Sequence, residues 1–416
     1  MRGKKTIFWG CWVIVLGMCW GITAEANMYN DATGNMGIGT TAPNAELQIV
    51  GVIAANNLDD NLAYRSCLRY VSATQVQVLA GTTIKIGTKI FYLSEDQTLT
   101  WTDIDTGSEE GGKDYHIFAY DNSGTLVFKI HKSTAYNDHI DIYGEDAGGL
   151  TYPSGYTSAN SKVIGGFHNN ATDTSATAGD ILQYSVWDRK NRPSCPDPRG
   201  MVKSKTKQVW YDIYLASAWD DGTVVTSMPG NDPYNTVSRR VRSVYQSTVW
   251  DTMTWYYAQQ RGHNSGKRLL MYDEFSEMAT GTPETTNITG SADPVTTGGH
   301  VDTGAVRIVS AIGAEDCAGV YWQWGRELYT RDDSGAAWAW VANTGGKGSI
   351  YHYHDYDPVA PLFGGRWDYG AYCGSRCLRT GTSGTRTPAV GRGLPVTLCN
   401  LKTENLFSVW GVEHRA

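Results

Sequence analysis

The sequence predicts an α+β protein in which a small all-β domain precedes a larger, loop-rich domain of strands and short helices. Short β-type runs separated by turn residues fill positions 66–143, whereas segments typical of helices occur at 250–260 and just after Leu270. Charged residues make up only 19% of the chain, and 47 residues are Gly, a composition typical of loop-rich, mostly β extracellular proteins. At 416 residues the chain is long enough for two or three domains with cores of their own.

Residues 1–26 are predicted to be a signal peptide. A basic start at 2–5 precedes the apolar run 7–22, and Ala24-Glu25-Ala26 provides the small residues needed for cleavage after Ala26. The apolar run is too short and too rich in Gly for a membrane span. We therefore expect a secreted or cell-surface protein with no stable membrane span after cleavage. A lipoprotein would use Cys19, but Met18 is a poor residue to precede a lipidated cysteine.

The charge and the cysteines set further limits. A formal net charge of −7 and a pI near 5.7 leave no basic surface, so no nucleic-acid partner is expected. An even number of cysteines follows the predicted cleavage point, which permits disulfides in an exported chain without revealing their pairing. These six residues are Cys67, Cys195, Cys317, Cys373, Cys377 and Cys399. Cys373 and Cys377 lie four residues apart, close enough in sequence to bridge within one loop.

The segment 27–55 contains a fibre-like motif. Residues 34–43, GNMGIGTTAP, and the following stretch 45–52 resemble a short repeat common in phage tail fibres and bacterial surface fibres. The resemblance implies a trimerising or docking segment, so we expect a homo-oligomer, with a trimer as the form that fibres suggest. A Gly-rich linker ahead of the first strand is the alternative.

Residues 56–150 are predicted to form a small β-sandwich or accessory domain. Its strands are expected at 76–79, 83–86, 90–93, 115–120 and 126–130. Asp121-Asn122-Ser123-Gly124 reads as a hairpin turn. The Gly-, Tyr- and Ser-rich stretch 144–159 suggests a domain boundary near residue 150. No catalytic constellation occurs here, so the domain is interpreted as a spacer.

Four ordered motifs in residues 151–416 point to a known family. The segments between 162 and 215 resemble the opening of the ligand-binding domain in variable proteins of diversity-generating retroelements. Residues 266–275 (GKRLLMYDEF), 313–324 (GAEDCAGVYWQW) and 361–367 (PLFGGRW) are similar to elements of formylglycine-generating-enzyme-like domains. The resemblance implies a C-type lectin fold for this domain.

Two helices are expected in this domain. One is predicted over 250–260 and the other directly after the GKRLL strand. Asp273 and Glu274 would lie favourably near the N-terminus of the second helix, and Phe275 with Ala279 would share its buried face.

The last loop, about 366–388, is the predicted ligand-binding element. It is rich in Tyr, Ser, Gly and Arg, which recognition loops favour. The family resemblance implies that Trp367, Gly370, Gly374, Ser375 and Arg376 form a fixed scaffold. It implies that the variable, ligand-binding positions are Arg366, Asp368, Tyr369, Tyr372, Leu378, Arg379, Thr380, Thr382, Ser383, Thr385 and Arg386.

We therefore expect a surface-exposed, adhesin-like receptor-binding protein that presents a hypervariable loop to an unknown protein or glycan on a cell surface. It is not expected to be an enzyme or to hold a cofactor. One alternative is a copper oxidase like the formylglycine-generating enzymes, using Cys373 and Cys377. Another is a structural fibre or filament subunit. The stretch 395–416 extends beyond the expected end of the loop as an added strand or a tail.

Metal sites are weakly indicated. Residues 351–357 (YHYHDYD) offer imidazole and carboxylate groups, but no third distant ligand is identifiable. Asp293, His300 and Asp302 are interpreted as a solvated turn. Structural calcium is left open, because Asp- and Asn-rich turns are plentiful but no twelve-residue cage motif is present.

Overall fold

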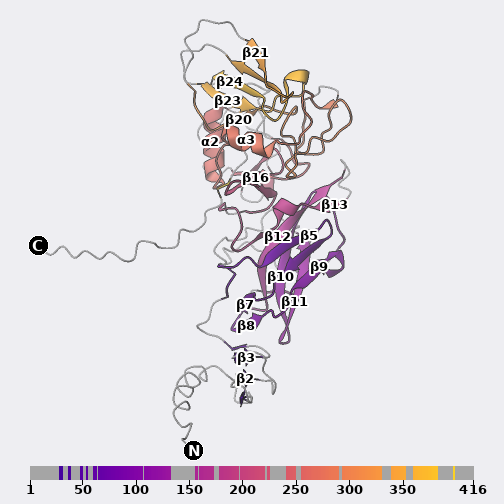
Figure 1. Ribbon diagram of the computed structural model, residues 1–416, viewed down its shortest axis with the longest axis vertical. Coiled ribbons are helices and arrows are strands. Elements are labelled where there is room, and N and C mark those ends of the chain that lie inside the picture. Colours follow the sequence, from indigo (N-terminus) through magenta and orange to yellow (C-terminus); the bar gives the residue numbers. More distant parts are fainter. Residues whose placement is uncertain are drawn as a thin grey trace, which may run out of the picture.

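The computed structural model describes residues 60–132, 155–220, 240–249, 254–329, 339–352 and 359–382, except for 63, 106, 158, 173–177, 196 and 290–292. Short paired strands are also described near the N-terminus and at 223–224 and 397–398. The predicted signal peptide lies outside the described residues. Strands dominate these ranges and two α-helices interrupt them, so the fold is mostly β (Figure 1).

The fibre-like segment contains three short strands in one sheet. They are β1 (Met28–Asn30), β2 (Met36–Ile38) and β3 (Leu47–Ile49). β1 pairs with β2 in antiparallel fashion, and β2 pairs with β3 in parallel. The backbone of the GIG motif is thus part of a strand. A role for this segment in trimerisation or docking stays a prediction.

Two three-stranded sheets follow. One contains β4 (Ile53–Ala54), β7 (Thr83–Ile86) and β8 (Lys89–Tyr92), and the other contains β5 (Leu68–Ser72), β6 (Gln75–Val78) and β9 (Gln97–Thr100). In β6 and β7 every second side chain is buried. A period of two is typical of a strand with one buried face. The strands expected near 76–79, 83–86 and 90–93 are confirmed.

The longest strands that the structure describes form the next sheet. It contains β10 (Lys113–Asn122), β11 (Thr125–Lys132), β12 (Ser161–Ala171) and β13 (Ala178–Ile181) in the order β11-β10-β12-β13, with β14 (Trp187–Asp188) beside β12. β10 and β11 are joined at Ser123 and Gly124, whose φ angles of 54° and 95° suit the mirror-image turn of a two-residue hairpin. The hairpin turn predicted at 121–124 is confirmed.

This sheet continues well past residue 150, where the sequence suggested a boundary. β12 pairs with β10 along most of its length, and its Phe167 ring stacks on Tyr115 at 5.5 Å in the buried core. Gly165 is required by close packing, because a Cβ atom there would lie 2.2 Å from the Trp187 carbonyl oxygen. The Gly-rich stretch of β12 therefore reflects the approach of β14 within one sheet.

Buried hydrogen bonds join this sheet to the chain that follows it. The Asp114 carboxylate accepts from the Gly200 N–H at 2.9 Å and lies 3.0 Å from His168 Nδ1. His168 Nε2 in turn lies 2.8 Å from the Tyr214 hydroxyl. Tyr245 packs so closely on Gly112 that a Cβ atom there would meet its ring at 2.4 Å. The β10–β14 sheet and the chain that follows it are therefore joined by several close contacts.

Two small sheets begin the C-terminal part. One contains β15 (Met201–Lys203), β16 (Val209–Asp212) and β25 (Thr397–Leu398), and the other contains β17 (Ala216–Asp220), β18 (Thr223–Val224) and β19 (Arg240–Ser243). β25 pairs with β16 in antiparallel fashion. Within the predicted 395–416 extension, residues 397–398 are thus an added strand, and the remainder lies outside the described residues.

Both predicted helices are present. α2 spans Trp255–Asn264, so it begins five residues later than predicted, where the Thr254 side chain accepts a hydrogen bond from the Tyr257 N–H. α3 spans Tyr272–Met278, with acidic residues in its first turn and with Phe275 and Ala279 buried, as expected. In the described part of the chain, no helix has the length and apolar character needed to cross a bilayer.

A five-stranded sheet completes the fold at one end of the molecule (Figure 1). Its order is β20-β23-β24-β22-β21, and only β22 and β24 run parallel. The strands are β20 (Gln323–Trp324), β21 (Ala339–Ala342), β22 (Ser349–His352), β23 (Val359–Phe363) and β24 (Leu378–Thr382). α3 packs against β23, where the buried rings of Phe275 and Phe363 stack with centroids 4.9 Å apart.

Two buried carboxylates lie before β20. Glu315 is bound by Arg307 at 2.6 Å and by the Gly299 N–H at 3.0 Å, while Asp316 lies 2.8 Å from His300 Nδ1. Burial raises the pKa of Glu315 to about 7, against the opposing charge of Arg307. Burial alone would lower the pKa of His300, but the Asp316 carboxylate raises it above its ordinary value.

The prediction that Asp293, His300 and Asp302 form a solvated turn is therefore wrong for His300 and Asp302. Asp302 is buried and accepts from the N–H groups of Gly304 and Val306 at 2.8 Å each. The signal that was missed is the buried partner of His300, which lies sixteen residues further along the chain.

We expect the stability of the protein to fall as the pH rises from about 4.5 to 7. Over this window the folded protein holds a proton on Glu315 that the unfolded chain has lost. The charged form of His300 contributes stability below about pH 6.5 that is also lost as the pH rises through its raised folded pKa. Denaturant unfolding at pH 5 and pH 8 should differ by up to about 3 kcal/mol through Glu315. Glu315→Gln should reduce the difference, and an unchanged pH profile in that variant would contradict the assignment.

Candidate functional site

The segment between β23 and β24, here called loop 364–377, lies at the end of the molecule formed by the five-stranded sheet (Figure 1). Its base is closed by backbone hydrogen bonds. The Gly364 N–H donates to the Cys377 carbonyl at 3.1 Å, and the Gly364 carbonyl accepts from Gly319 at 3.1 Å and from Gly374 at 3.3 Å. Both ends of the loop therefore meet at Gly364, so the loop leaves the sheet and returns to it at one point.

The neighbouring loops hold the far side of loop 364–377. Glu284 accepts from the Ser375 N–H at 2.9 Å and from the Ser375 hydroxyl at 2.6 Å, and it pairs with Lys347 at 3.3 Å. The Trp367 N–H donates to the Val320 carbonyl at 3.1 Å. The Trp367 ring packs edge-on against Tyr321, with centroids 5.2 Å apart. Neighbouring loops thus anchor Ser375 and Trp367, and their assignment to a fixed scaffold stays a prediction.

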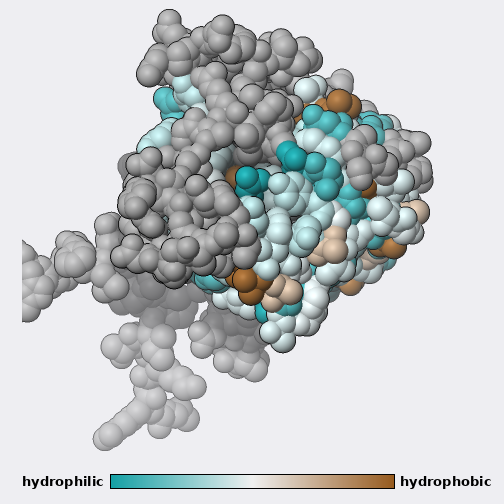
Figure 2. Space-filling view, turned by 90° about the horizontal axis from the view of Figure 1, so that it is seen from above, coloured by the Kyte–Doolittle hydropathy of each residue, from teal (hydrophilic) through white to brown (hydrophobic). Residues whose placement is uncertain are grey.

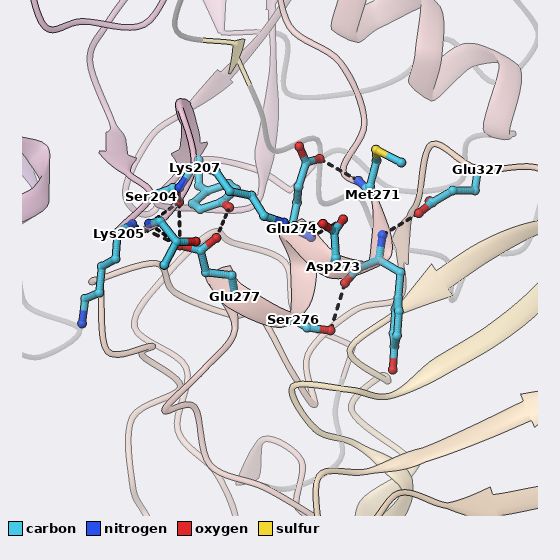
Figure 3. Close-up of polar contacts among 12 residues, drawn as sticks. Ser204, Lys205, Lys207, Met271, Asp273, Glu274, Ser276, Glu277 and Glu327 are labelled. Atoms are coloured by element: carbon cyan, nitrogen blue, oxygen red, sulfur yellow. Dashed lines mark hydrogen bonds and ion pairs between the residues drawn. The ribbon is translucent and has the colours of Figure 1, made fainter.

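Helix α3 contacts both the β15–β16 turn and the loop, and Figure 3 shows the contacts of Glu277 with the β15–β16 turn. The side chain of Glu277 accepts from the Ser204 hydroxyl at 2.5 Å and from the Lys205 and Thr206 N–H groups at 3.1 Å each. At the other end of the helix the Tyr272 hydroxyl donates to the Arg376 carbonyl at 3.0 Å. One short helix therefore ties the β15–β16 turn to the candidate loop.

Five paired positions form a row across all five strands, and two of them, Trp324 and Leu362, belong to a buried core cluster. The pairings run Trp324–Leu362, Leu362–Arg379, Arg379–Tyr351 and Tyr351–Trp340. Paired residues of neighbouring strands share a face of the sheet. Accordingly the Arg379 guanidinium lies 5.8 Å from the Tyr351 ring, and the Trp340 and Tyr351 rings are 4.5 Å apart. We call these residues the cross-sheet row.

The turn at residues 369–372 rests on one end of the cross-sheet row. Arg379 donates to the Tyr369 hydroxyl at 3.0 Å, and the Tyr369 ring meets Trp322 and Trp340 edge-on at 5.3 and 5.8 Å. Tyr372 stacks on Trp340 with centroids 4.4 Å apart and 14° between the planes. Tyr372 remains 42% exposed, so its ring combines a fixed position with an open surface.

Charged groups surround these aromatic residues. Arg366 forms a two-point ion pair with Asp368 and lies over the Tyr369 ring at 5.0 Å. Asp368 and Arg376 are exposed. Seen from this end of the molecule, the described surface is mostly hydrophilic or neutral, with only scattered hydrophobic residues (Figure 2). The site offers an amphipathic surface of Tyr, Arg and Asp and not a contiguous hydrophobic patch.

The structure brings together most of the predicted ligand-binding residues that it describes. Arg366, Asp368, Tyr369, Tyr372 and Arg379 lie on or around the 369–372 turn, and Thr380 is half-buried in β24. Thr382 ends β24, and Ser383, Thr385 and Arg386 lie outside the described residues.

The structure corrects the prediction that Leu378 is a ligand-binding residue. It is only 8% exposed and belongs to the core cluster that contains Phe363. Neighbouring residues on a strand face opposite ways, so Leu378 points to the core while Arg379 joins the cross-sheet row. Conversely, sequence reasoning missed Trp340 and Tyr351. Their place became apparent only from the parallel pairing of β22 with β24.

Cys373 and Cys377 are free thiols, as are the other cysteines of the described ranges. Both are buried, and burial raises the pKa of Cys373 to about 12 and that of Cys377 well above its ordinary value. Thiols of this kind stay protonated at neutral pH and are poor nucleophiles and metal ligands. Cys399 and most of the 351–357 run lie outside the described residues. Within the described ranges no three His, Cys, Asp or Glu side chains gather closely enough to hold a metal ion.

Fold and site together define a mostly β protein that presents one tethered loop at its end. Residues 66–188 match the domain family described as the Mtd second domain. The chain is 32% identical over 318 residues to the tail fiber receptor-binding protein of Bordetella phage BPP-1, a match covering 72% of this chain and 73% of the relative. The chain therefore belongs to the Mtd family, and its resemblance to the retroelement-diversified proteins is confirmed.

Solved structures agree with this assignment at the level of the fold. The Major Tropism Determinant M1 variant matches with a TM-score of 0.57 and 24% identity, over 91% of this chain and 95% of that one. The I1 variant matches with a TM-score of 0.56 and 25% identity, over 91% and 96%. The domain match to residues 66–188 ends where the β10–β14 sheet ends.

Gly364 should be far less tolerant of substitution than Gly345, although both have positive φ angles, of 86° and 78°. Alanine costs about 1–2 kcal/mol at either position for the left-handed backbone. A Cβ atom at Gly364 would in addition lie 2.3 Å from the Cys317 carbonyl oxygen, whereas at Gly345 it meets nothing within 4 Å. Urea unfolding should show Gly364→Ala losing at least about 2 kcal/mol more than Gly345→Ala. Equal losses would show that the base of the loop can shift.

Proposed function

We propose that this protein is a surface-exposed, adhesin-like receptor-binding protein, and that loop 366–388 is its ligand-contacting element. The observation that carries the proposal is Tyr372, an exposed ring stacked in a fixed position on an anchored loop. Membership of a family whose relative is called a tail fiber receptor-binding protein supports it. The ligand is proposed to be a protein or glycan on a cell surface.

The geometry suits binding because the loop loses little freedom when a ligand arrives. Its base is closed at Gly364, Glu284 holds Ser375, and the aromatic rings are already packed. Binding affinity rises when side chains do not have to be immobilised by the ligand itself. Tyr and Arg, which surround the turn, are residues that dominate binding hot spots.

The finer features of the scaffold are part of the proposal. We infer an α+β, C-type lectin-like domain that carries the loop, preceded by a small all-β domain that acts as a spacer. α3, the five-stranded sheet and the TM-scores against the tropism determinants support this inference. A homo-oligomer, with a trimer favoured, and an extracellular or virion-associated location are likewise proposed.

A binder is favoured over an enzyme. The relative is called a receptor-binding protein, and the raised pKa values of Cys373 and Cys377 disfavour a reactive thiolate pair. Neither a cofactor nor a catalytic residue is proposed. A fibre subunit without ligand-binding activity is disfavoured by the exposed aromatic surface of the loop.

Sequencing codons 360–395 across a population of the source organism tests the proposal. Substitutions should concentrate at Arg366, Asp368, Tyr369 and Tyr372, where side chains reach the surface. Trp367 and Gly374 should stay constant, because Trp367 packs on Tyr321 and Gly374 leaves no room for a Cβ atom beside Glu284. Uniform codons, or substitutions spread evenly over scaffold and surface positions, would contradict a diversified binding loop.

An array of bacterial surface glycans and outer-membrane proteins provides a direct binding test. Tyr372→Ala should weaken capture of the best-bound spot at least about tenfold, because a hot-spot tyrosine carries about 2 kcal/mol or more. The melting temperature should change little, since Tyr372 is exposed. Tyr256→Ala is the matched control, because this tyrosine on α2 is 60% exposed and also contacts a tryptophan. Equal affinity of the Tyr372→Ala and wild-type proteins would remove Tyr372 from the binding surface.

A further inference from the structure

We propose that Trp340, on the β21–β22 hairpin, is a positioning residue that fixes the 369–372 turn for ligand binding. This inference rests on the proposed function of the loop. Trp340 lies outside the predicted variable segment 366–388, and the family resemblance assigned it no role. It would therefore be a constant part of a binding surface whose other members change.

The position of Trp340 between the sheet and the turn is the first argument. Its neighbour in the cross-sheet row is Tyr351, with ring centroids 4.5 Å apart. It also contacts the two tyrosines of the turn, Tyr369 at 5.8 Å and edge-on, and Tyr372 at 4.4 Å and nearly parallel. Trp340 is half-buried and packs against the core cluster that includes Trp322. It is the one ring in the described ranges that contacts Tyr351, Tyr369 and Tyr372 together.

The second argument is that few contacts besides those of Trp340 hold the 369–372 turn to the sheet. The Tyr369 N–H bonds to Arg366 and the Tyr372 N–H bonds to Tyr369, so these backbone bonds stay within the loop. Gly370, at φ 50°, has no atom within 4 Å of its Cβ position. In the described part of the chain, the turn is held to the sheet by the Arg379–Tyr369 hydrogen bond and by the aromatic contacts.

The hairpin that carries Trp340 is itself fixed to the loop. Asn343 donates to the Arg376 carbonyl at 2.8 Å, and the Arg376 N–H donates to the Lys347 carbonyl at 3.0 Å. Gly348 lies so close to the loop that a Cβ atom there would be 3.1 Å from the Cys373 carbonyl oxygen. Because the turn end of the hairpin is anchored to the loop and β22 pairs with β24, Trp340 offers a rigid surface against which the turn can pack.

This arrangement has a consequence for specificity. The side chain at position 372 meets the flat face of Trp340 whatever residue occupies that position. Aromatic and long planar side chains gain from stacking there, whereas small ones leave the indole face open. Trp340 thus favours one geometry of the turn and supplies an apolar surface to the ligand when residue 372 is small.

Hydrogen exchange of the backbone amides, measured on the full chain without any ligand, tests the proposal. Trp340→Ala should speed exchange at Tyr372 and Cys373 by about tenfold or more, since three ring contacts are lost. Exchange in β10 and β12 should not change. Trp340→Phe should keep exchange at Tyr372 and Cys373 as slow as in the wild-type protein, because a phenyl ring still stacks. Trp340→Leu, which keeps an apolar side chain without a stacking ring, should show the same fast exchange as Trp340→Ala. Tyr256→Ala should leave the turn unaffected.

The outcomes separate the alternatives. Unchanged exchange at Tyr372 in both the Ala and Leu variants would overturn the proposal, because the turn would then be held by other contacts. Faster exchange throughout the five-stranded sheet in the Leu variant would also overturn it, since Trp340 would then be an ordinary core residue. Because no ligand enters the measurement, these results stand apart from the population sequencing that tests the binding function itself.

Discussion

The site depends on the contact at Gly364, where the backbone approaches the Cys317 carbonyl more closely than any side chain allows. The same residue bonds to Cys377, Gly319 and Gly374, so the start and the end of the loop are fixed to each other and to the segment before β20. A loop closed at its base can expose polar and aromatic side chains without exposing its own backbone ends. The arrangement separates the residues that hold the loop from those that are free to face a ligand.

Buried and half-buried carboxylates extend this rigidity into the rest of the C-terminal part. Glu284, Glu277 and Glu315 each accept backbone N–H groups, and each binds a segment distant in sequence. Side-chain carboxylates thereby replace regular strand pairing across the irregular loops. Such groups are costly to bury, which is why they occur with several donors each.

Much of the fold was predictable because local patterns decide it. Short β-type runs between turn residues predicted β6 and β7, and the acidic first turn with Phe275 and Ala279 predicted α3. The start of α2 was misplaced because the helix is capped by Thr254 and not by a residue near position 250. The boundary near 150 was misplaced because the pairing of β12 with β10 is non-local. The site was predicted only as a loop. Strand alternation excludes Leu378, and the roles of Trp340 and Tyr351 follow from a parallel pairing that leaves no signal in the sequence.

The buried junction between the sheet of β10 and the C-terminal part bears on how the molecule carries load. Asp114, His168 and Tyr214 form a continuous chain of contacts, and Tyr245 fills the space over Gly112. A hinge needs a segment that can change its backbone angles without breaking buried contacts, and this junction would have to lose several at once. Tension applied at the loop therefore reaches β10 and β12 through these contacts. Both strands are long, with ten and eleven residues, and they pair along most of their length, so the load is shared by many backbone hydrogen bonds.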